Sequence, residues 1–296
     1  MKKTNSPKTN AKKSGRKEAN AKSIRKKVDA LEKKKIIASL TLLDDLFMQV
    51  VLEEQACTEY ILQTILDNTS LKLKEQRLQK RLANLHGRAL VLDCLCTDDK
   101  GILYNIEVQN ASAGAIPKRA RYHAALMDTH SLKKGQNFSK LPDSYVIFIT
   151  DKDVLGKGKQ LYQIERVIRE PDSLFQDGSH ILYFNTARQY DNALGNLARD
   201  FKEANPKEIQ SEVLSHRVAS LKEGKLDQEG EKKMNVLLEK YRKKAVEEGM
   251  EKGVQQGQNR LALLVGRLLD AGRIDDLKRV SYDEVYREKL LKEFGL

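Results

Sequence analysis

The 296-residue sequence lacks the features that mark several large classes of protein. Three cysteines, Cys57, Cys94 and Cys96, form no disulfide framework and are typical of a reducing, cytoplasmic compartment. The longest apolar stretch, residues 42–66, is interrupted by two adjacent glutamates, so no segment supplies the roughly 18 uncharged apolar residues of a membrane span. No apolar segment of the kind found in secretory signals follows the basic N-terminal residues. We therefore expect a cytoplasmic protein that is not embedded in a membrane.

Complete motifs for several other chemistries are also missing. Cys94 and Cys96 have no second cysteine pair with which to hold zinc, and the five histidines show no paired metal-ligand spacing. The segment Gly156-Lys157-Gly158-Lys159 lacks the remaining residues of a phosphate-binding loop. We therefore predict a turn at residues 156–159 and no zinc site.

The positive charge of the chain is concentrated at one end. The formal net charge is +12, but residues 1–35 hold 14 Lys and Arg against three acidic residues and so carry +11 of it. This segment has hardly any large apolar side chains and is predicted to be a disordered basic tail. Its lysines could follow DNA phosphates in a salt-dependent manner, or they could be solvated without a dedicated partner. Because the remaining residues are nearly neutral, the overall charge alone does not indicate a nucleic-acid-binding fold.

Hydrophobic patterning in the first half of the chain predicts helices followed by a β-hairpin. Apolar residues at three- and four-residue spacings predict helices over 42–51 and 60–66. Residues 71–88 are weakly patterned, with a short strand expected near their start. Two apolar runs, 90–96 and 102–109, flank a turn-forming segment and predict a β-hairpin.

The second half of the chain continues this mixture and then becomes helical. Pro117 can open a helix that extends to Leu132, and residues 145–150 have the composition of a buried strand. A further strand is expected at 181–185, with 161–168 as its hairpin partner.

Strand signals fade after Pro206. The predicted organisation is therefore a tail (1–35), a mixed α/β domain (36–205) and a mostly helical C-terminal region (206–296). Within that region, glycines recur at a four-residue spacing, which favours a frayed or bent helical connector over a self-association seam (Gly249, Gly253 and Gly257).

Two acidic residues in the predicted hairpin are candidate metal ligands. If the turn is centred near Asp99 and Lys100, residues whose numbers sum to about 199 or 200 face each other, which places Asp93 opposite residues 105–107. Cross-strand neighbours lie about 4.5–5.5 Å apart, so the carboxylates of Asp93 and Glu107 could reach one ion. Carboxylate oxygens suit Mg²⁺ or Mn²⁺, although acids on adjacent strands also occur on solvated sheet faces.

The sequence resembles the PD-(D/E)XK nuclease superfamily, in particular its transposase-like branch of recombination-promoting nucleases. The resemblance covers roughly residues 41–250 and includes DDLFMQVV at 44–51, VLDCLCTDDKGILYNIEVQ at 91–109 and PKRARYH at 117–123. It implies an αβββαβ core of the restriction-endonuclease type and a metal-dependent DNA endonuclease, with a possible link to transposition or recombination. The expected order of helices and strands agrees with that core.

Matched to the pattern of this superfamily, the metal-binding acids fall on Asp93 and Glu107. Gln109 stands where the superfamily most often has lysine, and glutamine is common there in this branch. An amide can only hydrogen-bond, whereas lysine would also supply a positive charge. Arg119 matches an arginine of the branch and could contact phosphate, or it could pair with an acid of the protein itself. The resemblance thus implies catalytic roles for Asp93, Glu107 and Gln109, with Mg²⁺ or Mn²⁺ as cofactor and DNA as substrate.

A glutamate of the first helical segment, Glu53 or Glu54, could hydrogen-bond a water of the metal. The alternative reading, from a different class, is a nucleic-acid-binding or assembly protein whose nuclease-like core has lost catalysis. The sequence specifies neither the oligomeric state nor the target.

Overall fold

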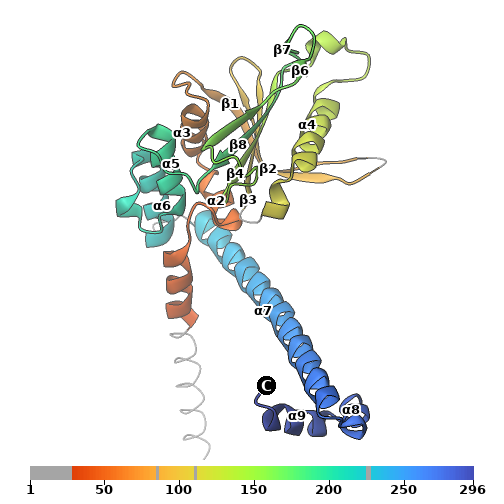
Figure 1. Cartoon of the computed structure of the whole chain (residues 1–296). Coiled ribbons are helices and arrows are strands. Elements are labelled where there is room, and N and C mark those ends of the chain that lie inside the picture. The colour runs from red at the N-terminus through yellow and green to blue at the C-terminus, as the bar shows by residue number, and fades with distance from the viewer. Residues whose placement is uncertain (1–28, 85–86, 110–111, 225–227) are drawn as a thin grey trace, which may run out of the picture. The chain divides into compact units, whose positions relative to one another are not determined.

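The computed structural model describes residues 29–84, 87–109, 112–224 and 228–296 (Figure 1). The chain forms two compact units, the first ending at Met234 and the second beginning at Asn235. Residues 29–39 are helical, so the last part of the expected tail belongs to a helix, while residues 1–28 lie outside the described residues.

The first unit is built around a mixed six-stranded sheet in the order β1-β2-β3-β4-β8-β5. The first three strands are antiparallel to one another, β3, β4 and β8 are parallel, and β5 returns antiparallel to β8. The strands of this sheet are β1 (Leu73–Leu82), β2 (Leu90–Asp98), β3 (Leu103–Gln109), β4 (Ser144–Thr150), β5 (Leu161–Ile164) and β8 (Ser179–Asn185). The expected mixed α/β fold is confirmed, because a helix precedes β1, β2 and β3, and another helix leads to β4.

Helices cover the two faces of this sheet. In Figure 1, α4 lies on one side, and α3, α5 and α6 lie on the other. Besides the helix over residues 29–39 and the start of α7, the first unit contains helices α2 (Asp45–Val51), α3 (Gln55–Ile65), α4 (Pro117–Ser131), α5 (Ala193–Lys202) and α6 (Glu212–Glu223). Short 3₁₀ turns lie at η1 (Ser112–Ala115), η2 (Phe138–Lys140) and η3 (Pro206–Glu208). Beneath α4, Ala120 and Ala124 pack against Val146, Phe148 and other buried side chains of the sheet. These small residues let the helix approach closely and hold its polar side chains near β3.

Local sequence signals explain where these helices begin. Pro117 occupies the first turn of α4, where its missing N–H is not needed. Asn192 caps α5 by accepting from the backbone N–H of Gly195, and Ser211 caps α6 by accepting from that of Leu214.

The unit boundary lies beyond the expected one at residue 205. Helices α5 and α6 have helical composition, but each buries an apolar face in the first unit, and both contact α3. Leu197 and Phe201 of α5 and Leu214 and Val218 of α6 are almost fully buried. Hydrophobic burial therefore assigns these helices to the sheet domain.

Two further strands form a separate ribbon. The expected hairpin partner of residues 181–185 is confirmed for Leu161–Ile164. Beyond it, β6 (Val167–Ile168) pairs with β7 (Ser173–Leu174), and this ribbon projects beyond the main sheet (Figure 1).

The second unit is helical, as expected for this part of the chain. Its elements are the part of α7 (Gln228–Asp270) that follows Met234, α8 (Ile274–Val280) and α9 (Glu284–Glu293). A small core joins the end of α7 to α8 and α9 through Leu264, Leu268, Val280, Leu290 and Leu291. The glycines at 249, 253 and 257 lie inside a continuous helix, so α7 is not frayed at these positions.

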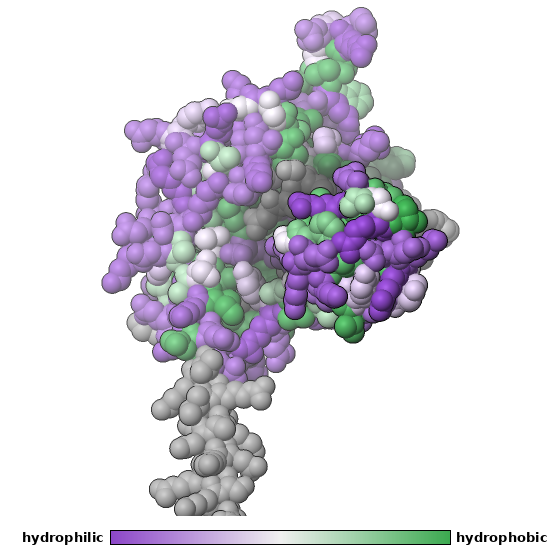
Figure 2. Space-filling view, turned by 60° about the horizontal axis from the view of Figure 1, so that its bottom comes forward, coloured by the Kyte–Doolittle hydropathy of each residue, from purple (hydrophilic) through white to green (hydrophobic). Residues whose placement is uncertain are grey.

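No described helix is long and apolar enough to span a membrane. On the face of the molecule shown in Figure 2, hydrophilic residues predominate among those described.

Candidate active site

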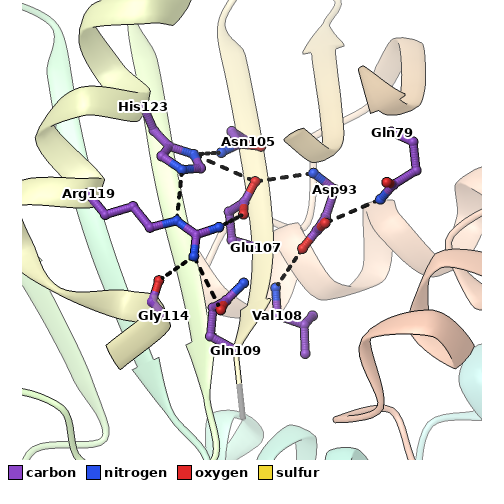
Figure 3. Close-up of polar contacts among 9 residues, drawn as sticks. All are labelled: Gln79, Asp93, Asn105, Glu107, Val108, Gln109, Gly114, Arg119 and His123. Atoms are coloured by element: carbon purple, nitrogen blue, oxygen red, sulfur yellow. Dashed lines mark hydrogen bonds and ion pairs between the residues drawn. The ribbon is translucent and has the colours of Figure 1, made fainter. Parts of the chain in front are cut away.

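Asp93 of β2 and Glu107 of β3 meet at the end of the ladder between these strands. In the paired residues, from Cys94 with Ile106 to Thr97 with Leu103, the two residue numbers always sum to 200, which is one of the two expected registers. Continuing this register places Asp93 opposite Glu107. The backbone N–H of Asp93 donates to Glu107 Oε1 at 3.1 Å, and the backbone N–H of Val108 donates to Asp93 Oδ2 at 3.4 Å (Figure 3). The structure thus brings both predicted acids together.

An irregularity in β1 accompanies Asp93. Leu78 pairs with Cys94 and Lys80 with Leu92, which leaves Gln79 opposite Asp93. Gln79 has a positive φ of 49°, a left-handed conformation that is uncommon for a residue other than glycine. Its side-chain amide donates to Asp93 Oδ1 at 3.2 Å (Figure 3).

The alternation of side chains along β1 changes phase at Gln79. A cavity of about 360 Å³ beside α4 is lined by odd-numbered residues before this position and even-numbered residues after it (Glu75, Arg77, Lys80 and Leu82). β2 changes phase in the same way: Leu95 and Thr97 line this cavity, whereas Leu90 and Leu92 join the hydrophobic cluster beneath α4. Such local irregularities re-aim side chains near functional sites. At this position the Asp93 backbone N–H donates to Glu107 Oε1.

The two carboxyl groups are held in an environment that disfavours two negative charges. The Glu107 side chain is fully buried, and burial together with repulsion from Asp93 raises its pKa to about 8. Burial also raises the pKa of Asp93, and Asp45 at the start of α2 contributes further repulsion. Hydrogen bonds from Gln79 and Val108 oppose this rise. The pair therefore favours an added positive charge.

Arg119 of α4 supplies a cation to this pair. Its Nη2 donates to Glu107 Oε2 at 3.3 Å, and its Nη1 donates to the Gly114 carbonyl at 2.9 Å and to Gln109 Oε1 at 3.5 Å (Figure 3). Its Nε donates to His123 at 3.2 Å. Of the five N–H donors of a guanidinium, one on Nη2 has no partner among the described residues. Arg119 therefore links Glu107, Gln109 and His123, and one of its N–H groups remains for a further acceptor.

Gln109 lies beside Arg119, and Gly114 leaves it the space to do so. The Gln109 oxygen faces the guanidinium, so its amide nitrogen is the end that remains to donate to another group. A Cβ added at Gly114 would lie 2.0 Å from Gln109 Oε1. The absence of a side chain at position 114 thus allows the observed placement of Gln109.

His123 fixes the orientation of Arg119 from the next turn of α4. Because a guanidinium can only donate, His123 Nε2 must accept and the ring proton lies on Nδ1. The Nδ1–H then points to Glu107 Oε1 at 3.6 Å as its acceptor, because the nearer Asn105 Nδ2, at 3.1 Å, is itself a donor. Burial and the neighbouring Arg119 lower the pKa of His123 to about 4, so the imidazole is neutral at physiological pH.

Several of these neighbours carry no strong signal in the sequence. Asn105 shares a strand face with Glu107 by simple alternation, and His123 follows Arg119 by one helical turn. The contacts of Gln79 and Gly114 depend on backbone geometry that no spacing encodes. Glu53 and Glu54, the other acids considered from the sequence, each lie 3.7 Å from Arg217 of α6.

The donor set fits a small divalent cation. Two carboxylates with raised pKa values and hard oxygen donors match Mg²⁺ or Mn²⁺, which keep several waters when bound. Each Asp93 oxygen accepts one hydrogen bond and keeps a second lone pair for a metal ion. Within the described ranges, no cluster of three or more His, Cys, Asp and Glu side chains has metal-binding geometry, so these two acids would be joined by water or substrate oxygens.

Comparison with known proteins identifies a family for this chain. The family model of the PD-(D/E)XK nuclease family transposases matches residues 30–191, which is more than half of the chain. No curated protein and no solved structure shows significant similarity to the chain.

Proposed function

Because the chain belongs to the family of PD-(D/E)XK nuclease family transposases, we propose that it is a metal-dependent DNA endonuclease with Asp93 and Glu107 as its metal ligands. Membership of this family implies a nuclease with a function related to transposition, and PD-(D/E)XK nucleases generally use divalent metal ions. The observation that carries the finer proposal is the meeting of the two acids, where the Asp93 N–H contacts Glu107 Oε1 at 3.1 Å.

The proposed chemistry divides between the acid pair and the groups around it. When bound by Asp93 and Glu107, Mg²⁺ or Mn²⁺ would polarise the scissile phosphate and activate water. Arg119 balances the buried charge of Glu107 and presents its remaining N–H to a phosphate oxygen. Gln109 orients the attacking water by donating from its amide nitrogen. Gln79 holds the Asp93 carboxylate in place through Oδ1.

Cleavage of supercoiled plasmid in Mg²⁺ or Mn²⁺ tests this proposal. Asp93→Asn and Glu107→Gln keep the side-chain shape but remove the charge, and each should reduce nicking by more than the roughly 10–100-fold typical of changes to outer-shell partners of a metal. Glu165→Gln is a matched control, because Glu165 pairs with His180 beyond the end of β5. Calorimetric titration with Mn²⁺ gives a second measurement. Glu165→Gln should bind Mn²⁺ as the wild type does, whereas Asp93→Asn and Glu107→Gln should bind it more weakly.

The result also decides between the nuclease and a protein that only binds DNA. Equal nicking by the wild type and both site variants would refute the assignment of Asp93 and Glu107. DNA binding without cleavage by the wild type in either metal would favour the alternative of a nuclease-like core that has lost catalysis.

A further inference from the structure

A basic cleft adjoins the acid pair. It has a volume of about 1010 Å³, at the upper end of the range for small-ligand sites. One wall comes from residues just before β2 and at its start, and the other from the first turns of α4. Its positively charged lining residues are Arg88, Lys118, Arg119 and Arg121.

None of the residues that the structure describes as lining this cleft neutralises its positive charge. The described residues that line it include no Asp or Glu. Arg88, Lys118 and Arg121 are exposed, and no ion pair joins them to any other described residue. The N-terminus of α4, which has no acidic residue in its first turn, adds the positive end of a helix dipole. The cleft is therefore a strong attractor for anions.

Hydrogen bonds hold the two walls together. The Tyr122 hydroxyl of α4 donates to the Arg88 carbonyl at 2.6 Å and accepts from the Asn84 amide at 2.9 Å. Because Arg88 is tied to the helix through its backbone, its side chain and Arg121 flank the same space. The cationic groups are thus positioned by the fold before any ligand binds.

The cleft leads to the acid pair through two residues. Arg119 lines the cleft and also donates to Glu107. Val91 of the opposite wall precedes Asp93 by two residues on β2, and both Val91 and Ile116 expose almost half of their surface. These apolar groups could contact sugars between phosphates, while the cations contact the phosphates themselves.

We propose that this cleft binds the sugar-phosphate backbone of a DNA strand and guides it toward Asp93 and Glu107. The inference rests on the proposed nuclease function, and it names the surface on which the substrate lies. The contacts are to phosphate, so binding here is independent of base sequence. Arg88, Lys118 and Arg121 act in binding rather than in the chemical step.

The salt dependence of DNA binding tests this surface. We would measure binding of a fluorescent DNA duplex by anisotropy between 50 and 200 mM salt, without divalent ions, using the full chain. Each phosphate contact contributes about 0.9 to the slope of log affinity against log salt, or about 3.5-fold over this range. Arg88→Ala combined with Arg121→Ala should therefore reduce the slope by about 1.8 and the salt-induced loss of affinity by about 12-fold.

A charge-matched control separates the cleft from general electrostatics. Lys133 and Lys134 are exposed beyond the other end of α4, so Lys133→Ala combined with Lys134→Ala removes the same charge outside the cleft. This control should keep the slope of the wild type, and the double substitution of Arg88 and Arg121 to lysine should restore it. Equal slopes for the cleft variant and the control would overturn the proposal. Equally tight binding of polyglutamate would do so too, because it would indicate an acidic protein as partner.

Cleavage assays keep this inference distinct from the proposed function. The wild type and the control variant of Lys133 and Lys134 should hydrolyse a small phosphodiester, bis(p-nitrophenyl) phosphate, at the same rate, because these lysines lie outside the cleft. If the wild type hydrolyses neither this compound nor plasmid, the proposed function fails, while the difference in salt slope still reports on the cleft.

Discussion

Replacement of Glu107 by glutamine should stabilise the metal-free protein at neutral pH. Glu107 is buried beside Asp93, and its pKa is raised from 4.5 to about 8. Between these values the native state keeps a proton that the unfolded chain has lost. The free energy of unfolding of the wild type therefore falls as the pH rises through this window.

Linkage gives the size of the effect. One pKa unit corresponds to about 1.36 kcal/mol, so the penalty at pH 7.5 is at most about 4 kcal/mol. A protonated carboxyl and a carboxamide have the same shape, and each presents one acceptor and one donor group. The free energies of unfolding of the wild type and Glu107→Gln should thus differ by less than about 1 kcal/mol at pH 5. Above pH 5 this difference should grow by up to about 1.4 kcal/mol for each pH unit.

Urea unfolding in EDTA at pH 5, 6, 7 and 8 measures this divergence, with Glu165→Gln as a control that should follow the wild type. Addition of Mg²⁺ at pH 8 should raise the stability of the wild type by more than that of Glu107→Gln, because only the wild type keeps both ligands. Parallel stability curves for the wild type and Glu107→Gln across this pH range would refute the argument that burial of Glu107 opposes its ionisation.

Three further predictions concern the groups around the pair and the N-terminal segment. Gln79→Ala and Gln79→Gly both remove the hydrogen bond to Asp93, so they should reduce plasmid nicking equally. Because glycine adopts a positive φ without strain, the Gln79→Gly variant should be more stable than Gln79→Ala by about 1 kcal/mol in urea unfolding. Gly114→Ala should displace the flexible Gln109 amide, lowering the nicking rate while the melting temperature stays within a few degrees of the wild type. Deletion of residues 1–28 removes Lys and Arg side chains, so it should lower DNA affinity and flatten its salt dependence in anisotropy measurements; unchanged salt slopes would show that the segment does not bind DNA.

The meeting of the two acids could be predicted because a tight turn fixes the hairpin register. Asp98 Oδ1 accepts from the backbone N–H groups of Lys100 and Ile102, and Gly101 adopts a positive φ of 86°. Once the turn is placed, counting along both strands gives the pairs as far as Cys94 with Ile106, directly beside the two acids. A one-residue error in the turn would have turned one acid to the other face of the sheet.

The length of β1 and the extent of the sheet domain could not be read in the same way. β1 is an edge strand whose interior is rich in charged and amide side chains, so its ten residues lack the apolar alternation that reveals a half-buried strand. Helices α5 and α6 follow the last strand and have helical composition. Their packing against α3, and that of α6 against α2, shows that they belong to the sheet domain.

The replacement of the usual lysine by Gln109 does not deprive the site of a positive charge, because Arg119 delivers one from α4. Its guanidinium contacts both Glu107 and Gln109 and is held by His123. An arginine, unlike a lysine, stays protonated in a protein and cannot accept a proton. His123 is buried, and the only ring nitrogen without a proton already accepts from Arg119. The amide groups among the described side chains that contact the two acids cannot take up a proton either. If the protein cleaves DNA as proposed, the proton of the attacking water must therefore pass to a carboxylate of the pair, to the substrate phosphate or to solvent.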